Sequence, residues 1–305
     1  MKIAVLGPGS MGLLYGSKLS GQADVFLVGN NEEHIRLINK NGITVKRGKE
    51  MSHYNIRAVV SAADEEPVDL IMLCTKAYVT HDALDACRNL IGKDTCLLTL
   101  QNGLGHEDIL RDFTDDEHIL IGTTTLGSYR VNSYTIVNSG LGETVIGRIG
   151  EHNKDNDAKV GQIAEIFEKA GFPCKVTDNI KFIVWNKLMI NASSSVLSGV
   201  LGKPQGFVAE NMYAWDICCD LIRELCDIAG GEGCRFEFAE QAERIKNHLK
   251  AAPGGYTSIY SDLQNKRMTE VDYISGAVVR AAHRQGKKVP THELMVKLVH
   301  ALEQA

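Results

Sequence analysis

The chain has 305 residues, 44% of them hydrophobic and 23% charged, and its 33 Lys and Arg residues against 38 Asp and Glu residues give a formal net charge of −5. This length predicts two domains, each large enough for its own hydrophobic core. The near-average composition excludes a disordered or collagen-like chain, and the lack of a basic excess argues against nucleic acid as a partner.

The cysteine spacing and the apolar runs bear on metal binding and on the compartment. The eight cysteines include no CxxC pair and the ten histidines no HExxH pair, so we expect reduced thiols and no metal site. The N-terminal apolar run stops at Gly7, too early for a secretion signal, and no run reaches the roughly 20 apolar residues of a membrane span. These features predict a soluble cytoplasmic protein without membrane contact.

In chain order, the first half alternates apolar strands with helical stretches. We expect strands at 2–6, 24–28, 69–74 and 95–100, and helices at 10–19 and 78–90. Such alternation is typical of an α/β domain in which helices cover a doubly wound, Rossmann-like parallel sheet. The segments 42–48 and 54–60 are expected to form a β-ribbon inserted after the second strand.

The second half changes character twice. The segments that follow are, in order, antiparallel strands within 118–150 that extend or cap the sheet, a helix at 154–170 and a strand at 173–176. After Asp178 only helical patterns occur, beginning with a long helix that runs to about Ser198. We therefore place an α/β domain at 1–178 and an all-helical domain at 179–305.

A glycine-rich loop directly follows the first strand. It consists of Gly7, Pro8, Gly9, Ser10, Met11 and Gly12. In a βαβ unit, Gly7 allows the tight turn, Gly9 lets the backbone approach a pyrophosphate, and Gly12 lets the helix lie close to the strand. An ordinary glycine-rich turn is the alternative, but the flanking strands and helix favour a dinucleotide site, with the helix N-terminus facing the phosphates.

The end of the second strand bears on which dinucleotide is bound. An acidic residue there accepts hydrogen bonds from the ribose diol of NAD, and an arginine accommodates the 2′-phosphate of NADP. The corresponding segment is Gly29-Asn30-Asn31, followed by Glu32 and Glu33. Because Asn30 suits either form, the residues alone leave NAD(H) and NADP(H) both open.

Polar residues follow two further strands, at the edge where open α/β sheets bind ligands. Thr75 and Lys76 follow the strand at 69–74, and Gln101, Asn102 and Gly103 follow the next strand. The alternatives are a turn dipeptide for Asn102-Gly103 and a solvated surface residue for Lys76. If these residues are functional, we expect their side chains to line the same ligand site.

The first helix of the second domain carries three polar residues at a spacing of four. Lys187, Asn191 and Ser195 stack along one helix face, among apolar neighbours that include Trp185 and Met189. A snorkelling lysine with a buried stem is the alternative. Partial burial would lower the pKa of Lys187, which suits a general acid.

A later helix contributes a carboxylate. Thr269 is a plausible N-cap and Asp272 completes a capping-box-like pattern, which places Glu270 in the first helical turn of a helix that ends at Gly286. An acid favoured by the helix dipole is the alternative for Glu270. Ser258, which precedes this segment, carries no signal of its own.

Taken together, these motifs resemble the ketopantoate reductase (2-dehydropantoate 2-reductase) family over nearly the whole chain. The resemblance rests on GPGSMG, LCTK, QNGLG, GETVIG, WNKLMIN and TSIYSDLQNKRMTEVDYISG, of which the last two are the most specific. It implies a Rossmann domain, a helical C-terminal domain and the NADPH-dependent reduction of ketopantoate to pantoate in pantothenate biosynthesis. Helical domains of this superfamily often pair, so a homodimer is among the expectations.

The resemblance also implies roles for individual residues. Lys187 matches the catalytic lysine that donates a proton to the C2 carbonyl oxygen, and Glu270 matches the carboxylate that binds the substrate hydroxyl and orients the lysine. The remaining matches are cofactor contacts at the glycine loop, Asn30, Lys76 and Asn102, and substrate contacts at Asn102, Lys187, Asn191, Ser195, Ser258 and Glu270.

The chain departs from the family pattern at three positions. Ser195 and Gly255 stand where the family usually has asparagines, and Asn30 stands where an arginine is common. The first two departures leave the exact 2-keto acid substrate open, and the third leaves the cofactor form open. A reductase of another 2-keto acid and a dinucleotide-binding sensor without turnover therefore remain as alternatives.

Overall fold

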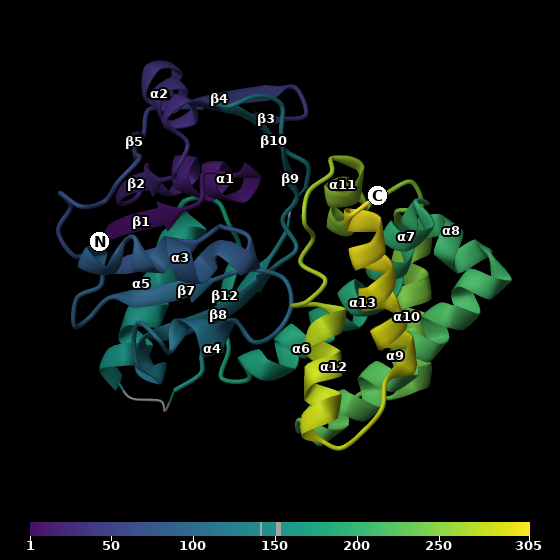
Figure 1. Cartoon of the computed structure of the whole chain (residues 1–305). Helices are drawn as coiled ribbons and strands as arrows, with labels where there is room; N and C mark the ends of the chain where they lie inside the picture. The colour runs from purple at the N-terminus through teal and green to yellow at the C-terminus, as the bar shows by residue number, and fades with distance from the viewer. Residues whose placement is uncertain (141, 151–153) are drawn as a thin grey trace. The chain divides into compact units, whose positions relative to one another are not determined.

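The structure is a computed structural model that describes residues 1–140, 142–150 and 154–305, with side chains of the last range described from residue 157. The chain divides into two compact units, one formed by Met1–Gln101 with His106–Ile180 and the other by Asn102–Gly105 with Lys181–Ala305. Strands occur in the first unit, whereas the regular elements of Lys181–Ala305 are helices (Figure 1). The expected α/β domain followed by a helical domain is thus confirmed as a fold class.

The first unit is built on an eight-stranded sheet with the strand order β12-β11-β8-β7-β6-β1-β2-β5. Its strands are β1 (Lys2–Leu6), β2 (Asp24–Val28), β5 (Arg57–Val59), β6 (Leu70–Leu73), β7 (Cys96–Thr99), β8 (Ile119–Thr124), β11 (Thr144–Arg148) and β12 (Cys174–Val176). From β5 to β8 all neighbours are parallel, while β11 runs antiparallel to β8. The central strands are buried along their length because both faces of a parallel sheet are covered.

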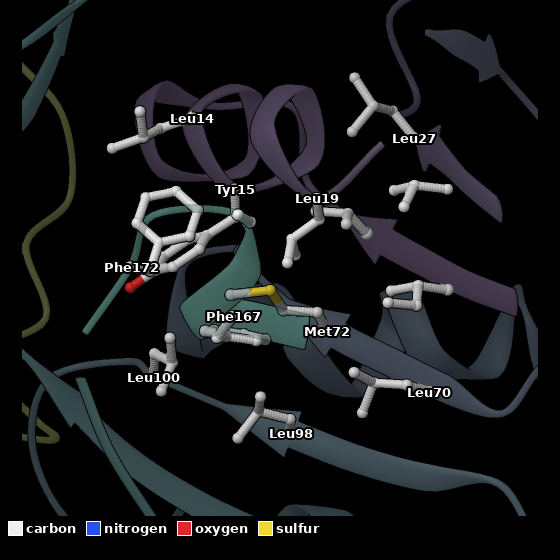
Figure 2. Close-up of a cluster of buried hydrophobic side chains, with 14 of the residues drawn as sticks. Leu14, Tyr15, Leu19, Leu27, Leu70, Met72, Leu98, Leu100, Phe167 and Phe172 are labelled. Carbon is white, nitrogen blue, oxygen red and sulfur yellow. The ribbon is translucent and has the colours of Figure 1, made fainter. Parts of the chain in front are cut away.

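The helices of this unit supply the other side of its core. They are α1 (Ser10–Leu19), α2 (Glu32–Asn41), α3 (Thr80–Asp85), α4 (His106–Leu110) and α5 (Lys154–Lys169). Figure 2 shows side chains of α1 facing those of β6 and β7, with Tyr15 beside Phe167 and Phe172. The Tyr15 ring centroid lies 4.7 Å from that of Phe172, and the Tyr15 hydroxyl lies 3.1 Å from the hydroxyl of Thr144. This packing fixes α1, and with it the loop that precedes α1.

A second, four-stranded sheet corrects the expected ribbon. Its order is β4-β3-β10-β9, formed by β4 (Glu50–Tyr54), β3 (Ile43–Arg47), β10 (Thr135–Asn138) and β9 (Ser128–Arg130). The expected pairing of 42–48 with 54–60 is wrong, because Gly48, at φ +57, allows a two-residue turn that pairs β3 with β4 instead. The apolar residues Ile56 and Ala58 are buried as β5 joins the main sheet beside β2.

Two other expectations hold only in part. Within 118–150, β8 and β11 extend the main sheet as expected, but β9 and β10 belong to the second sheet. The helical stretch at 78–90 is broken into α3 and two 3-10 turns, Ala77–Val79 and Arg88–Leu90.

The second unit packs eight helices around an apolar core. They are α6 (Ile180–Ile190), α7 (Val196–Leu201), α8 (Gln205–Glu210), α9 (Met212–Gly231), α10 (Phe238–Ala251), α11 (Ser258–Gln264), α12 (Ser275–Arg284) and α13 (Pro290–Glu303). The long helix expected to reach Ser198 is interrupted by a π-helical turn, Asn191–Ser195, between α6 and α7. The core includes the indole of Trp185 and the buried face of α9.

Candidate active site

The glycine loop joins β1 to α1 with the geometry that its three glycines predict. Gly7 has φ +93, and a Cβ there would lie 2.8 Å from the backbone nitrogen of Thr75. A Cβ on Gly12 would lie 2.1 Å from the carbonyl oxygen of Gly7. Both positions therefore exclude a side chain, because the backbones of the loop, of the helix and of the segment after β6 are in direct contact there.

Gly9 differs from the other two, and this difference bears on ligand binding. A Cβ on Gly9 would have no atom within 4 Å, so this position faces open space. Gly9 is the N-cap of α1, without a side-chain hydrogen bond to the cap, and the first turn of α1 holds no acidic residue. A helix N-terminus of this kind attracts phosphate groups through its amides and its dipole. The loop thus fits the pyrophosphate of a dinucleotide.

Asn30 lies beside this loop. A Cβ on Gly29 would be 2.6 Å from Cγ of Pro8, so the end of β2 packs directly on the glycine loop. The Asn30 side chain is exposed, and Glu32 and Glu33 follow in the first turn of α2. Asn30 is therefore exposed next to the loop, and its amide can both donate and accept hydrogen bonds.

Lys76 lies on the other side of the loop. It is half-buried and occupies the N-cap position of the 3-10 turn Ala77–Val79, three residues after the end of β6. The preceding residue, Thr75, is the one whose backbone nitrogen approaches Gly7. Within the first unit, the structure thus brings Asn30, Lys76 and the glycine loop to one end of the sheet.

Within the second unit, Lys187 and Glu270 form the core of a separate cluster. Lys187 is half-buried near the end of α6, and Glu270 is buried, with 8% of its surface exposed. Burial lowers the pKa of Lys187 to about 8, while the negative charge of Glu270 opposes that shift. A lysine with a pKa near neutrality can donate a proton and recover it, as a general acid must.

Asn102 joins this cluster from a distant part of the sequence. The Nδ2 group of Asn191 donates a hydrogen bond of 3.4 Å to Oδ1 of Asn102. The Leu104 N–H donates to the carbonyl oxygen of Tyr273 at 2.9 Å, which holds the Asn102–Gly105 loop against the turn that carries Glu270. The sequence pattern did not indicate that this loop belongs to the second unit.

Gly103 shows how closely the two segments pack. It has φ +106, and a Cβ there would lie 2.0 Å from the carbonyl oxygen of Tyr273. Because no side chain fits at this position, the glycine of the QNG sequence is required by the contact itself. The turn that bears Glu270 and the loop that bears Asn102 are thus held in register by their backbones.

Ser195 lies at the end of the π-helical turn. Its hydroxyl accepts a hydrogen bond of 3.4 Å from Nε2 of Gln205, and its carbonyl accepts one from the Thr257 hydroxyl. The hydroxyls of Ser193 and Ser194 donate to carbonyl oxygens one turn earlier. Such π-turns occur often at functional sites. The serine run was the only sequence signal for this turn, and no motif marked Gln205.

Ser258 is less closely tied to the cluster. It is exposed and is the first residue of α11, whose N-cap Thr257 accepts a hydrogen bond from the Tyr260 N–H. Thr257 also donates to the Ser195 carbonyl, so Ser258 is connected to the π-turn through its neighbour.

The expected helix start around Glu270 is wrong. Residues 271–274 form a turn, and α12 begins only at Ser275. The Thr269 hydroxyl accepts a hydrogen bond from the Val271 N–H at 3.2 Å, not from the residue three positions later. Glu270 therefore lies on a bend before the helix, and not in a helical turn.

The reason is a pair of contacts with the C-terminal helix. Oδ1 of Asp272 lies 3.1 Å from Nε2 of His300, and the Thr269 N–H donates to the carboxylate of Glu303 at 2.7 Å. Both His300 and Glu303 lie on α13. These tertiary contacts replace the local capping box that the sequence favoured.

Two kinds of feature are absent from the part of the chain that the structure describes. No group of three or more His, Cys, Asp or Glu side chains among them is arranged to hold a metal ion. None of the helices described is both long enough and apolar enough to cross a membrane.

Models of known protein families match both units of this chain. The family model "Ketopantoate reductase PanE/ApbA" matches residues 3–151, and its C-terminal counterpart matches residues 179–303. The 2-dehydropantoate 2-reductase of Pyrococcus horikoshii is 31% identical over 99% of this chain and 98% of the relative. That of Lactococcus lactis is 29% identical over 100% of this chain and 98% of the relative.

Solved structures agree. D-mandelate dehydrogenase with NADH and anilino(oxo)acetate is 28% identical, with a TM-score of 0.93 over 100% of this chain and 99% of that one. A PanE/ApbA family ketopantoate reductase from Ralstonia eutropha is 25% identical, with a TM-score of 0.88 over 100% of this chain and 99% of that one. On these matches, the chain belongs to the ketopantoate reductase PanE/ApbA family.

Proposed function

We propose that this protein reduces 2-dehydropantoate (ketopantoate) to pantoate, with a nicotinamide dinucleotide as the hydride donor. The observation that carries the proposal is the burial of Lys187, which lowers its pKa to about 8, at a place where the charge of Glu270 acts on it. Family membership and relatives that are named 2-dehydropantoate 2-reductase support the choice of substrate.

The residues that would hold the dinucleotide lie in the first unit. Gly7, Gly9 and Gly12 would let the pyrophosphate approach the N-terminus of α1, and Asn30 and Lys76 border the same loop. Asn30 offers neither the acid that repels a 2′-phosphate nor the cation that attracts it. We therefore expect the protein to accept both NADPH and NADH, with weak discrimination between them.

When bound, the dinucleotide supplies a hydride to the C2 carbonyl carbon. Lys187 donates a proton from its ammonium group to the carbonyl oxygen, so that the C=O group becomes C–OH and the lysine becomes a neutral amine. The charge of Lys187 also stabilises the negative charge that develops on that oxygen. The neutral amine then regains its proton from water, which a pKa of about 8 allows near neutral pH.

Glu270, Asn102 and Asn191 orient the reacting groups. The negative charge of Glu270 raises the pKa of Lys187 and so keeps the lysine protonated before the reaction. Asn191 donates a hydrogen bond to the amide of Asn102, and we propose that the Asn102 amide contacts substrate or cofactor. Ser195 and Ser258 are proposed as further substrate contacts.

Steady-state kinetics test this function directly. Purified protein should oxidise NADPH and NADH in the presence of ketopantoate, with pantoate identified as the product. A phenyl-substituted 2-keto acid is the comparison substrate, because the chain is 28% identical to a D-mandelate dehydrogenase. We expect the higher kcat/KM for ketopantoate. Absence of turnover with either dinucleotide would refute the proposal, and a higher kcat/KM for the phenyl compound would reassign the substrate.

A further inference from the structure

The side-chain amide of Gln101 joins three partners at one end of the main sheet. Gln101 is the last residue of the first of the two segments that form the first unit, and it follows β7 closely. Its Oε1 accepts a hydrogen bond of 2.9 Å from the Thr99 hydroxyl, and its Nε2 donates to the carbonyl oxygen of Thr75 at 2.7 Å and to the Thr80 hydroxyl at 2.8 Å. Since a carbonyl oxygen only accepts, the amide has a single orientation that satisfies these partners.

These hydrogen bonds act on the backbone around Lys76. The Thr75 carbonyl belongs to the peptide group before Lys76. The buried Thr80 hydroxyl in turn donates a hydrogen bond of 3.2 Å to the carbonyl oxygen of Lys76, which belongs to the peptide group after Lys76. Gln101 thus holds one peptide group directly and the other through Thr80. Holding both groups restricts the two backbone dihedral angles of Lys76, and hence the direction of its Cα–Cβ bond.

The segment that is held in this way borders the glycine loop. The backbone nitrogen of Thr75 is so close to Gly7 that a Cβ on Gly7 would lie 2.8 Å from it. A shift of the Thr75–Lys76 segment would therefore disturb the loop as well as the lysine. The partners of Gln101 are the hydroxyl of Thr99 at the end of β7, the loop carbonyl of Thr75 and the hydroxyl of Thr80 at the start of α3, so its amide connects three elements at this edge of the sheet.

We propose that Gln101 is a positioning residue, which fixes the backbone on both sides of Lys76 and thereby sets the affinity for the dinucleotide. The inference rests on the proposed function in assigning the dinucleotide to the glycine loop and to Lys76 beside it. It does not depend on the identity of the 2-keto acid.

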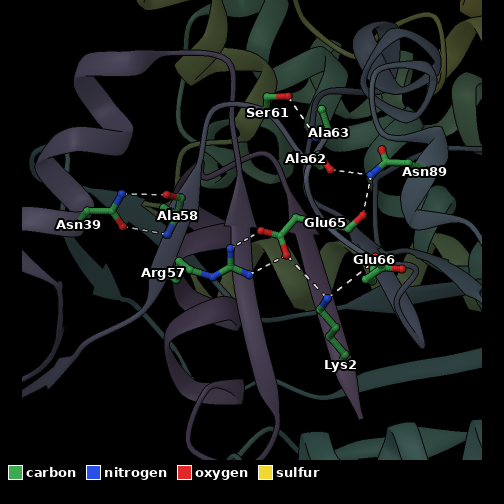
Figure 3. Close-up of polar contacts among 10 residues, drawn as sticks. All are labelled: Lys2, Asn39, Arg57, Ala58, Ser61, Ala62, Ala63, Glu65, Glu66 and Asn89. Carbon is green, nitrogen blue, oxygen red and sulfur yellow. Dashed lines mark hydrogen bonds and ion pairs between the residues drawn. The ribbon is translucent and has the colours of Figure 1, made fainter.

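The test compares two amides of the same unit. Gln101→Met keeps the length of the side chain and removes its hydrogen bonds. The matched control is Asn89→Leu, because the Asn89 amide also donates to two loop carbonyls, those of Ala62 at 2.6 Å and Glu65 at 2.8 Å (Figure 3). We expect Gln101→Met to raise the Kd for NADPH or NADH about tenfold, the effect of roughly one net hydrogen bond. Asn89→Leu should leave the Kd unchanged, while it lowers Tm about as much as Gln101→Met does.

A double variant separates positioning from a general structural role. If Gln101 acts through Lys76, the double variant should have nearly the same Kd as Lys76→Ala alone. If the two residues act independently, their effects on the free energy of binding should add. Thr80→Val removes the relay to the Lys76 carbonyl and should raise the Kd about threefold; it also serves as the test if Gln101→Met does not fold.

Dinucleotide binding is measured by fluorescence titration and turnover is measured separately, so the two proposals can fail independently. Protein that binds dinucleotide tightly but does not reduce ketopantoate contradicts the proposed function and leaves the Gln101 test intact. A wild-type Kd in both Gln101→Met and Thr80→Val, or full additivity with Lys76→Ala, would overturn the role of Gln101.

Discussion

The glycine loop and the Lys187 cluster are built from different parts of the chain and from different chemical groups. The loop is one continuous segment, and it relies on backbone amides and on the absence of side chains at Gly7 and Gly12. The Lys187 cluster is made of side chains, contributed by α6, by the π-turn, by the Asn102–Gly105 loop and by the turn at Glu270.

This difference predicts how each site responds to substitution. A substitution in the loop acts sterically, because an added atom either occupies the volume that a phosphate needs or collides with the neighbouring backbone. A change in the cluster acts through chemistry, because a proton donor or a charge is lost. Affinity for the dinucleotide and the rate of the chemical step should therefore respond to different variants.

The largest effect is expected at the proton donor. Lys187→Ala should lower kcat by roughly 1,000-fold, within the range for a lost general acid, and leave the Kd for the dinucleotide unchanged. Lys181→Ala is the matched control, because Lys181 lies on the same helix, is exposed and pairs with Glu232. Steady-state kinetics with a fluorescence measurement of Kd provide both values. A wild-type kcat in Lys187→Ala would remove this residue from the mechanism.

The same contrast explains what the sequence predicted well. The segments 2–6, 10–19 and 24–28 form a strand, a helix and a strand with the expected bounds. Each of the two strands ends directly before a glycine that close packing requires, Gly7 after the first and Gly29 after the second. The glycine loop could also be found from the sequence, because all of its residues are neighbours in the chain.

The failures concern contacts between distant segments. No local pattern indicates that Asn102 belongs with Asn191, or that Asp272 turns to His300 and so delays the start of α12. The ribbon was misassigned because β4 is largely exposed and polar, so that its pairing with β3 depends on the turn at Gly48 and not on an apolar pattern. Lys187 could be singled out because its apolar neighbours lie on its own helix.

The second prediction tests whether the cluster also depends on backbone contact. Gly103→Ala places a Cβ 2.0 Å from the Tyr273 carbonyl oxygen, which must push the Asn102 loop away from the turn of Glu270. We expect kcat to fall by roughly 30-fold, because small displacements of positioned groups are costly in catalysis.

Gly105→Ala is a closely matched control for that variant. Gly105 lies in the same loop and also has a positive φ, +88, but the nearest atom to its Cβ would be 3.8 Å away, on Arg280. Both variants therefore strain the backbone, and only Gly103→Ala creates the collision. Equal losses of kcat in the two variants would show that strain, and not the contact with Tyr273, is responsible.

The third prediction concerns space in the glycine loop. Gly9→Ala adds a methyl group that meets no atom of the protein, at a residue whose φ of −75 suits alanine. Tm should therefore stay the same, whereas the Kd for the dinucleotide should rise about tenfold because the methyl group occupies room that the pyrophosphate needs. Gly230→Ala, in α9 and equally open, should change neither Kd nor the fold. A wild-type Kd in Gly9→Ala would place the pyrophosphate elsewhere.

The smallest expected effect is a shift in the pH dependence of kcat, and it tests the charge coupling inside the cluster. Lys187 donates its proton, so only the protonated form is active and kcat should fall as the pH rises through about 8. Burial favours the neutral amine and lowers this pKa, whereas the carboxylate of Glu270 favours the ammonium form and raises it. Glu270→Gln removes the charge and retains the size of the side chain, so the alkaline limb of the pH profile should move to lower pH. If it stays in place or moves to higher pH while the limb of the wild type lies near 8, the charge of Glu270 does not act on Lys187, and the carboxylate serves the substrate alone.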